Sequence, residues 1–341
     1  MKKFLLALLA IAACNLAASA AIKGDVDGDG EVTSGDVTVL YNYLLMSDDS
    51  SMVNGDVDGD GEITSGDLTV VYNILLGVDT PVEPPAPVIE FTVNGVTFKM
   101  VEVEGGTFVM GTPSQEGVVN PTAAHDVTLT TYCIGQTEVT QELWVAVMGY
   151  NPSYFNEKGN PDYYSYHEQY ECGINLQRPV DYINIADCEA FIAKLNELTG
   201  CTFRIPTEAE WEFAARGGNL SQGYTYPGSN NVDEVAWYRE TIPTMVLGGE
   251  GWGPQSVATL LPNELGIYDM GGNDEEWCND WYGNYPADPV TNPTGPETGN
   301  YRVTRGGKWN SYAISCTPQL RAFNNSAVRG NSRTLRLAMT K

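Results

Sequence analysis

Aspartates alternate with small residues near the start of this chain, and the same arrangement returns further along. The segment from Gly24 is GDVDGDGEVTSGDVTVLYNYLL, and the segment from Gly55 is GDVDGDGEITSGDLTVVYNILL. The two copies differ only by Val/Ile, Val/Leu, Leu/Val and Tyr/Ile, all of them exchanges between apolar residues. Carboxylates at alternate positions, followed by a glycine that permits a sharp turn, are typical of an EF-hand-like loop that gives Ca²⁺ its oxygen ligands.

The ligand positions 1, 3, 5, 7, 9 and 12 of such a loop are filled in both copies. In the first loop they are Asp25, Asp27, Asp29, the carbonyl of Glu31, Thr33 and Asp36. In the second loop they are Asp56, Asp58, Asp60, the carbonyl of Glu62, Thr64 and Asp67. A merely solvated acidic surface explains neither the glycines nor the duplication. We therefore predict two bound calcium ions.

An apolar pattern with helical spacing follows each loop. Its members are Val37, Leu40, Tyr41 and Leu44 in the first copy, and Leu68, Val71, Tyr72 and Leu75 in the second. A duplicated loop with one following helix resembles a type I dockerin module. The resemblance implies docking to a cohesin module on a scaffold or cell surface. The pairs Ser34-Gly35 and Ser65-Gly66 match the positions that help to set the partner, and identical pairs suit binding in two orientations.

The N-terminus has the layout of a secretory signal peptide. Lys2 and Lys3 precede an apolar run, and residues 18–20 are Ala-Ser-Ala, a small-residue cleavage pattern. An alternative is a lipobox at residues 11–14, in which cleavage before Cys14 would leave a lipid-anchored protein. We favour cleavage after residue 20, which predicts a protein that is secreted or displayed at the cell surface.

Charge and composition define the partners and the domain limits. The chain has 44 acidic and 18 basic residues, a formal net charge of −26, which excludes nucleic acid as a partner because phosphates need a basic surface. Residues 79–90 are DTPVEPPAPVIE, and their prolines indicate an extended spacer. We predict a signal peptide over 1–20, a calcium-binding domain over 21–78, a linker over 79–90 and a large domain over 91–341.

The large domain is rich in glycine and aromatic residues and has few amphipathic segments. Residues 101–112 predict two short strands around a Gly-Gly turn. Three helices are expected: one after the N-cap Thr140, one that ends at Gly200 with Ala190, Ile192, Leu195 and Leu198 near helical spacing, and one from Pro206 to Gly217.

Six motifs of the large domain occur in the order GGTFVMG, EVTQELWVAVMGYNPSYF, RPVDYINIADCEAF, FRIPTEAEWEFAARGG, NELGIYDMGGNDEEWCNDWY and RVTRGGKW. Together they resemble the formylglycine-generating enzymes, the sulfatase-modifying factors, over nearly all of residues 91–341. The resemblance implies a C-type-lectin-like fold of short strands, few helices and ordered loops. The fold class of the whole chain is thus predicted to be α+β, a small helical calcium-binding module followed by a large loop-rich domain.

Cys316 is the candidate catalytic residue. In formylglycine-generating enzymes two cysteines after the RGG-x-W motif hold copper(I) and oxidise a cysteine of a sulfatase; here Ser311 and Cys316 match those positions. Copper(I) is a soft ion that favours thiolates, so the serine breaks the pair. We predict non-catalytic ligand binding. Copper-dependent oxidation through Cys316 is the alternative. A branch of iron-dependent sulfoxide synthases is excluded because it needs a histidine cluster, and the chain has only His125 and His167.

The number of cysteines in the chain also bears on the role of Cys316. The chain has 7 cysteines, and removal of Cys14 with the signal peptide leaves six: Cys133, Cys172, Cys188, Cys201, Cys278 and Cys316. Six in an exported protein are compatible with three disulfides, whose connectivity the sequence leaves open. A free catalytic Cys316 would leave a second cysteine unpaired. A structural or simply buried Cys316 is therefore favoured.

The family resemblance implies one more calcium site. Asn273 and Glu276 match positions that help to hold a structural calcium, whereas Asp274 and Glu275 replace apolar or small residues of the family. The alternative is an exposed acidic turn beside buried Trp277 and Trp281.

The chain after Trp309, NSYAISCTPQLRAFNN, mixes polar, aromatic and aliphatic residues. It resembles the variable ligand-binding proteins of diversity-generating retroelements, which use the same fold and vary this C-terminal surface. That identity is a second alternative. We predict a recognition surface for a protein, peptide or glycan, formed by Tyr312, Ile314, Leu320 and Phe323.

Overall fold

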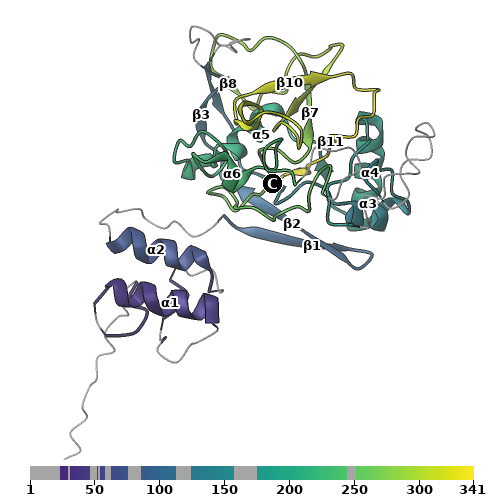
Figure 1. The fold of residues 1–341 in the computed structure, drawn as a ribbon. Helices are drawn as coiled ribbons and strands as arrows, with labels where there is room; N and C mark the ends of the chain where they lie inside the picture. The colour runs from purple at the N-terminus through teal and green to yellow at the C-terminus, as the bar shows by residue number, and fades with distance from the viewer. Residues whose placement is uncertain are drawn as a thin grey trace, which may run out of the picture. The chain divides into compact units, whose positions relative to one another are not determined.

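Two units, Met1–Pro84 and Pro85–Lys341, divide the chain (Figure 1). This computed structural model describes residues 24–29, 31–46, 52, 54–57, 63–75, 86–112, 124–156, 175–243 and 251–341. The predicted signal peptide with Cys14, most of the linker, His167 and Cys172 lie outside these residues. Within the described residues, no helix is long and apolar enough to cross a membrane.

In the described part of the smaller unit, two helices, α1 (Ser34–Met46) and α2 (Ser65–Leu75), pack against each other (Figure 1). The side chains buried between them and the loops are Val26, Val39, Leu40, Val57, Val70 and Val71. The predicted apolar pattern is therefore only partly right. Leu40 and Val71 are buried, but Tyr41, Leu44, Tyr72 and Leu75 are exposed, because each short helix buries one narrow stripe against its partner.

Within the described residues, three sheets form the frame of the larger unit. Their strand orders are β1-β2-β5-β12-β6, β10-β9-β7-β11 and β3-β4-β8. The strands of the first sheet are β1 (Val88–Val93), β2 (Val96–Val103), β5 (Tyr132–Gly135), β12 (Ala338–Thr340) and β6 (Phe203–Arg204). Those of the second are β10 (Arg321–Asn324), β9 (Arg302–Arg305), β7 (Glu275–Trp281) and β11 (Arg333–Thr334). Those of the third are β3 (Thr107–Met110), β4 (His125–Thr128) and β8 (Val290–Thr291).

The strands around the Gly-Gly turn exist, but they join different sheets. β2 pairs with β1 and β5, whereas β3 pairs with β4. Gly105 lies where the chain passes close to another segment, since a Cβ there would lie 2.5 Å from the carbonyl oxygen of Leu129. The hairpin that does form joins β1 to β2 through Asn94 and Gly95, which have φ values of 48° and 85°. Two positive φ values in a two-residue turn suit the twist of a hairpin.

The three predicted helices are confirmed. α3 (Gln141–Met148) begins where the Thr140 hydroxyl accepts a hydrogen bond from the Leu143 N–H, and it ends at Gly149. α4 (Ile185–Thr199) has a capping box between Asn184 and Asp187, and it ends at Gly200, whose φ is 72°. α5 (Glu208–Ala215) is capped by Thr207. The described part of the unit also contains three shorter elements: η2 (Gly218–Leu220), α6 (Val232–Val235) and η3 (Ala313–Cys316).

The α3–α4 pair covers one core of the larger unit, where the Trp144 ring of α3 stacks on Phe191 of α4 with centroids 4.7 Å apart (Figure 1). The buried face of α4 is Ile185, Cys188, Phe191, Ile192 and Leu195. Ala190 and Leu198, which we expected on that face, are exposed instead. The buried stripe therefore runs through Cys188 and Phe191, because an α-helix has 3.6 residues per turn and only one of its faces packs against the sheet.

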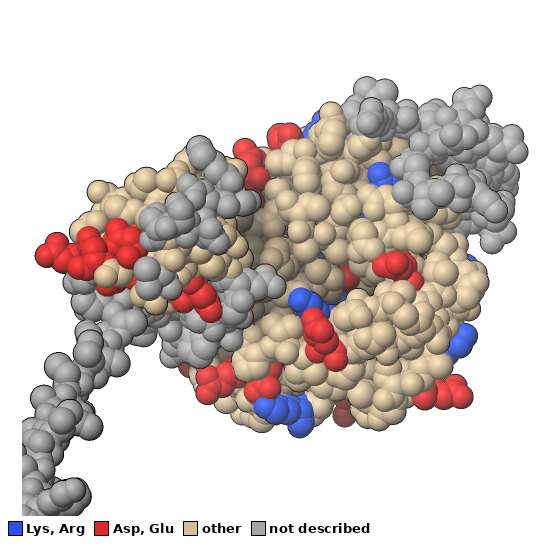
Figure 2. Space-filling view, turned by 90° about the horizontal axis from the view of Figure 1, so that it is seen from below, with Lys and Arg blue, Asp and Glu red and all other residues tan. Residues whose placement is uncertain are grey.

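α5 lies in a second core and carries three buried glutamates, each matched by an arginine. Arg321 pairs with Glu208 (2.5 Å), Arg204 with Glu210 (2.6 Å), and Arg305 with Glu212. Buried charges need such partners because isolated ones are costly to desolvate. On the face drawn in Figure 2, charges of both signs are scattered over the larger unit, whereas acidic groups gather on the smaller one.

Two leucines of α4 provide a matched test of this packing. Leu195 is 0% exposed and Leu198 is 45% exposed. Leu195→Ala is expected to lower the free energy of unfolding by about 2–5 kcal/mol, because it leaves a cavity in the core. Leu198→Ala should change it by less than about 0.5 kcal/mol. Urea denaturation of both variants checks this, and equal effects would contradict the assigned orientation of α4.

Candidate calcium loops and ligand-binding surface

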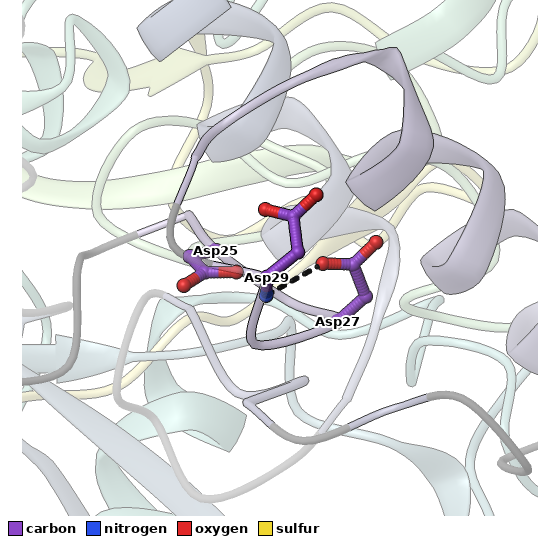
Figure 3. A group of neighbouring side chains, drawn as sticks. All are labelled: Asp25, Asp27 and Asp29. Atoms are coloured by element: carbon purple, nitrogen blue, oxygen red, sulfur yellow. Dashed lines mark hydrogen bonds between the residues drawn. The ribbon is translucent and has the colours of Figure 1, made fainter.

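The first loop gathers three carboxylates. Asp25, Asp27 and Asp29 each place one carboxylate oxygen within 4.8 Å of the others (Figure 3). The Asp29 N–H donates to Asp27 Oδ1 (3.1 Å) and the Glu31 N–H donates to Asp29 Oδ1 (2.8 Å), so the backbone turns tightly around the group. Three carboxylates so close repel one another unless a cation lies between them. An all-oxygen set fits a hard divalent ion such as Ca²⁺.

Asp36, at position 12 of the loop, is not one of these three grouped carboxylates, and its oxygens accept hydrogen bonds from the loop backbone. Its Oδ1 accepts hydrogen bonds from the N–H groups of Val26 (2.6 Å) and Asp27 (3.2 Å), and its Oδ2 accepts one from Thr33 (2.7 Å). The side chain is fully buried. Asp36 therefore fastens the loop to the first turn of α1, and this holds Asp27 in position.

The second loop repeats this arrangement as far as it is described. Asp67 is fully buried and accepts hydrogen bonds from the N–H groups of Val57 (2.6 Å) and Thr64 (2.8 Å). Thr33 and Thr64 are alike as well, since each hydroxyl accepts from the N–H two residues on, at 2.9 Å and 3.0 Å. Asp56 is exposed, and Asp58, Asp60 and Glu62 lie outside the described residues.

Asn273 and Glu276 do not fit a calcium site. Both oxygens of Glu276 accept from the buried guanidinium of Arg336 at 2.7–3.0 Å, and Oε2 also accepts from the Trp211 indole (2.7 Å). Asn273 Oδ1 accepts from the Gln255 N–H (2.8 Å), and its Nδ2 donates to Glu138 Oε2 (2.8 Å). An arginine already neutralises the carboxylate that calcium would need.

The alternative of an exposed acidic turn is wrong too. Asp274 and Glu275 are buried. Beside them lies Glu138, which accepts from the Asp274 N–H (3.0 Å) and whose pKa is raised well above its usual value by burial and then by the charge of Asp269. Sequence reasoning missed Glu138, because its only sequence signal is its place just before α3.

Cys316 is buried in η3 against Ala236 and Tyr238. Burial, and after it the charge of Glu240, raises the pKa of its thiol to about 12. At neutral pH the residue is therefore a neutral thiol, and the thiolate is the form that attacks substrates and binds metals. Ser311 is half-buried and is fixed by its backbone, whose carbonyl accepts from the Arg239 N–H (3.0 Å).

Five of the six cysteines expected in the mature chain are described, and all five are free: Cys133, Cys188, Cys201, Cys278 and Cys316. Three disulfides are therefore not formed. Burial raises the pKa of the Cys188 and Cys278 thiols well above the usual value. These cysteines pack as small apolar side chains in the cores.

The predicted recognition residues all lie at the surface. Their exposed fractions are 61% for Tyr312, 65% for Ile314, 37% for Leu320 and 47% for Phe323. Arg239 lies over the Tyr312 ring, 5.1 Å from its centroid, and donates to its hydroxyl (3.3 Å). Exposed apolar side chains on a well-defined backbone are suited to the recognition of a ligand.

Two tyrosines that sequence reasoning missed extend this surface. Phe323 contacts Tyr282 and Tyr301, with centroids 4.5 Å and 5.2 Å apart. Tyr301 immediately precedes β9 and Tyr282 immediately follows β7, and these strands bring them to Phe323 on β10. Only the pairing of the strands reveals this, because the three residues are far apart in sequence.

Arg305 holds the chain that carries the surface. Its buried guanidinium donates to the carbonyls of Pro318 (2.9 Å), Gln319 (3.2 Å) and Leu320 (2.9 Å) while it pairs with Glu212. At the other end of this segment, Gly307 lets two stretches of backbone pass close together, since a Cβ there would lie 2.7 Å from the Ser315 carbonyl oxygen.

This arrangement of short strands, few helices and long ordered loops is a C-type-lectin-like fold, joined to a paired-loop calcium module. Residues 88–341 match the family described as "Sulfatase-modifying factor enzyme 1-like domain", and residues 23–76 match "Dockerin type I domain". The chain therefore belongs to the sulfatase-modifying factor enzyme 1-like family and carries a type I dockerin domain. Dockerin domains bind calcium and cohesin modules, and they occur in extracellular proteins.

Relatives in this family differ in what they do. The chain is 36% identical over 239 residues to "Chaperone protein LppX" of Paenibacillus barcinonensis, covering 63% of this chain and 79% of the relative. It is 40% identical over 124 residues to the formylglycine-generating enzyme of Thermomonospora curvata, which covers 33% of this chain and only 40% of that enzyme.

Solved structures with the same fold include "Treponema denticola variable protein 1". Its TM-score is 0.61 at 30% identity, covering 74% of this chain and 99% of that one. PvdO from Pseudomonas aeruginosa shares the fold, with a TM-score of 0.60 at 23% identity, covering 76% of this chain and 100% of that one.

The first loop offers a matched pair of charge removals. Asp27→Asn removes a carboxylate of the three-residue group and is expected to weaken calcium binding at that loop roughly tenfold or more. Glu31→Gln removes the same charge from a side chain that is exposed and is a ligand only through its carbonyl, so affinity should stay within about threefold. Calorimetric titration of chelator-treated protein measures both, and equal losses would contradict the assignment.

Proposed function

We propose that this protein is an exported, calcium-loaded dockerin protein whose large domain binds a ligand without chemical turnover. The observation that carries the proposal is the surface of Tyr312, Ile314, Leu320 and Phe323. These residues are exposed. The segment that carries them is held in place by Arg305, which donates to the Leu320 carbonyl and is itself paired with Glu212. Rigid aromatic and aliphatic groups lose little conformational entropy on binding, and this favours recognition.

The thiol chemistry supports binding over oxidation. An oxidase of the formylglycine-generating kind would need two thiolates to hold copper(I). This chain offers the Ser311 hydroxyl and a Cys316 thiol whose pKa is raised to about 12. A hydroxyl and a buried neutral thiol make a poor site for a soft cation, so the similarity to formylglycine-generating enzymes supports the fold more than the activity.

Two relatives support a binding role. "Chaperone protein LppX", by its name, acts on another polypeptide, and "Treponema denticola variable protein 1" is 30% identical to this chain over nearly its whole length. Neither name describes an oxidation. Protein, peptide and glycan ligands are all compatible with an apolar surface bordered by tyrosines and Arg239.

The dockerin domain would anchor the large domain to a cohesin-bearing scaffold. The side chains that α1 and α2 leave exposed form near-equivalent apolar faces: Tyr41, Leu44, Leu45, Tyr72, Ile74 and Leu75. Because Tyr41 matches Tyr72 and Leu44 matches Leu75 in the repeat, either helix presents a similar surface. That equivalence supports docking in two orientations.

Glycan and peptide arrays probed with the full-length protein test the proposed surface. Phe323→Ala is expected to weaken binding of the best array ligand roughly tenfold or more, because a central aromatic anchor is lost. Tyr150→Ala removes another exposed ring, 51% exposed, at the end of α3 and should leave affinity unchanged. Either the lack of any binder or a Phe323→Ala variant as tight as the native protein would contradict the assignment.

A further inference from the structure

A pocket of about 510 Å³ opens beside the start of α5. Its walls are largely apolar, formed by Met110, Ala209, Pro286, Val290, Pro293 and Pro296. Its polar lining includes the carboxyl of Asp280, near the end of β7, beside the Glu208–Arg321 ion pair. The other polar lining residues are His125, Asn284, Tyr285, Thr291 and Thr294. The ligand surface proposed above does not include this pocket.

Asp280 differs from every carboxylate around it. Glu208, Glu210 and Glu212 of α5 each pair with an arginine. Asp280 is only 4% exposed, yet among the described residues it has no cationic partner. Its sole hydrogen-bond donor there is the backbone N–H of Glu208, which donates to Oδ2 (2.9 Å). A nearly buried carboxylate without a cation is costly, so this site favours a positively charged occupant.

Gly295 keeps the second oxygen of Asp280 accessible. A Cβ at Gly295 would lie 3.2 Å from Asp280 Oδ1 and 2.9 Å from its Cβ. Since Gly295 also lines the pocket, the missing side chain leaves space in front of Oδ1. The pocket therefore combines apolar walls with a single free carboxylate oxygen.

We propose that this pocket binds the side chain of a lysine from a partner polypeptide, with its ammonium paired to Asp280 Oδ1. Apolar walls suit the four methylenes of lysine, which bury their length while the ammonium seeks an acceptor. Arginine fits less well, because its planar guanidinium pairs best with two acceptor oxygens and Asp280 Oδ2 already accepts from the Glu208 N–H. The net charge of −26 also attracts a basic partner.

Protonation gives this site a characteristic pH dependence. Burial, and after it the charge of Glu208, raises the pKa of Asp280 to about 7, with Glu210 acting in the same direction and Arg321 opposing it. The lysine ammonium stays charged well above this range. Affinity therefore rises with pH as Asp280 ionises. His125 also lines the pocket.

NMR titration of the full-length protein tests the proposal with three capped amino acids. These are Nα-acetyl-lysine N-methylamide and its norleucine and arginine counterparts. At pH 8 the lysine probe should bind roughly tenfold or more tightly than norleucine, since only lysine supplies a charge-assisted hydrogen bond. It should also bind more tightly than arginine, and its affinity should fall towards pH 6.

Two variants complete the test. Asp280→Asn keeps an oxygen for the Glu208 N–H but loses the charge, so the lysine probe should bind it no better than norleucine. Asp126→Asn removes an exposed carboxylate of β4 outside the pocket lining and should bind like the native protein. Gly295→Ala, which keeps the charge and fills the space before Oδ1, should also weaken the lysine probe. Absent lysine binding, equal binding of lysine and norleucine, or full binding by Asp280→Asn would overturn the proposal.

Discussion

Much of the larger unit depends on one buried ion pair, between Arg305 of β9 and Glu212 of α5. Both side chains are fully buried, so each charge requires the other. The same guanidinium donates to the carbonyls of Pro318 and Leu320. A helix of the core is thus linked directly to the segment that carries the proposed ligand surface.

A second buried pair, Arg336 with Glu276, shows how this fold uses charge. Glu276 matches a calcium ligand of the family in sequence, yet in this chain its oxygens accept hydrogen bonds from Arg336 and Trp211. The group suited to calcium instead lies in the first dockerin loop, where Asp25, Asp27 and Asp29 each bring one carboxylate oxygen within 4.8 Å of the others. The larger unit thus pairs several of its buried acids with arginines, whereas the first dockerin loop gathers carboxylates that a calcium ion would neutralise.

Local signals in the sequence predict local structure well. The caps at Thr140 and Gly200 set the ends of helices through contacts only a few residues apart, and these predictions are confirmed. The loop aspartates follow from spacing for the same reason. By contrast, the pairing of Glu276 with Arg336 and the meeting of Tyr282, Tyr301 and Phe323 depend on strand order. No short stretch of sequence carries that order.

The same distinction explains the apolar pattern of the first dockerin helix. Spacing predicts that Leu40 and Tyr41 share a stripe, but the partner helix covers only Leu40. Which part of an apolar stripe is buried depends on the size of the partner, and a two-helix unit is small. The exposed remainder then becomes available for docking.

Mass spectrometry of a sulfatase-motif peptide, incubated with the full-length protein, copper and oxygen, tests the central claim most directly. The account predicts that the peptide cysteine stays unchanged with the native protein, because Ser311 and the neutral Cys316 thiol do not hold copper(I). A Ser311→Cys variant, run beside it, shows whether restoring the second thiol restores activity. Conversion of the cysteine to formylglycine by the native protein would contradict the account and establish an oxidase that works with one thiol.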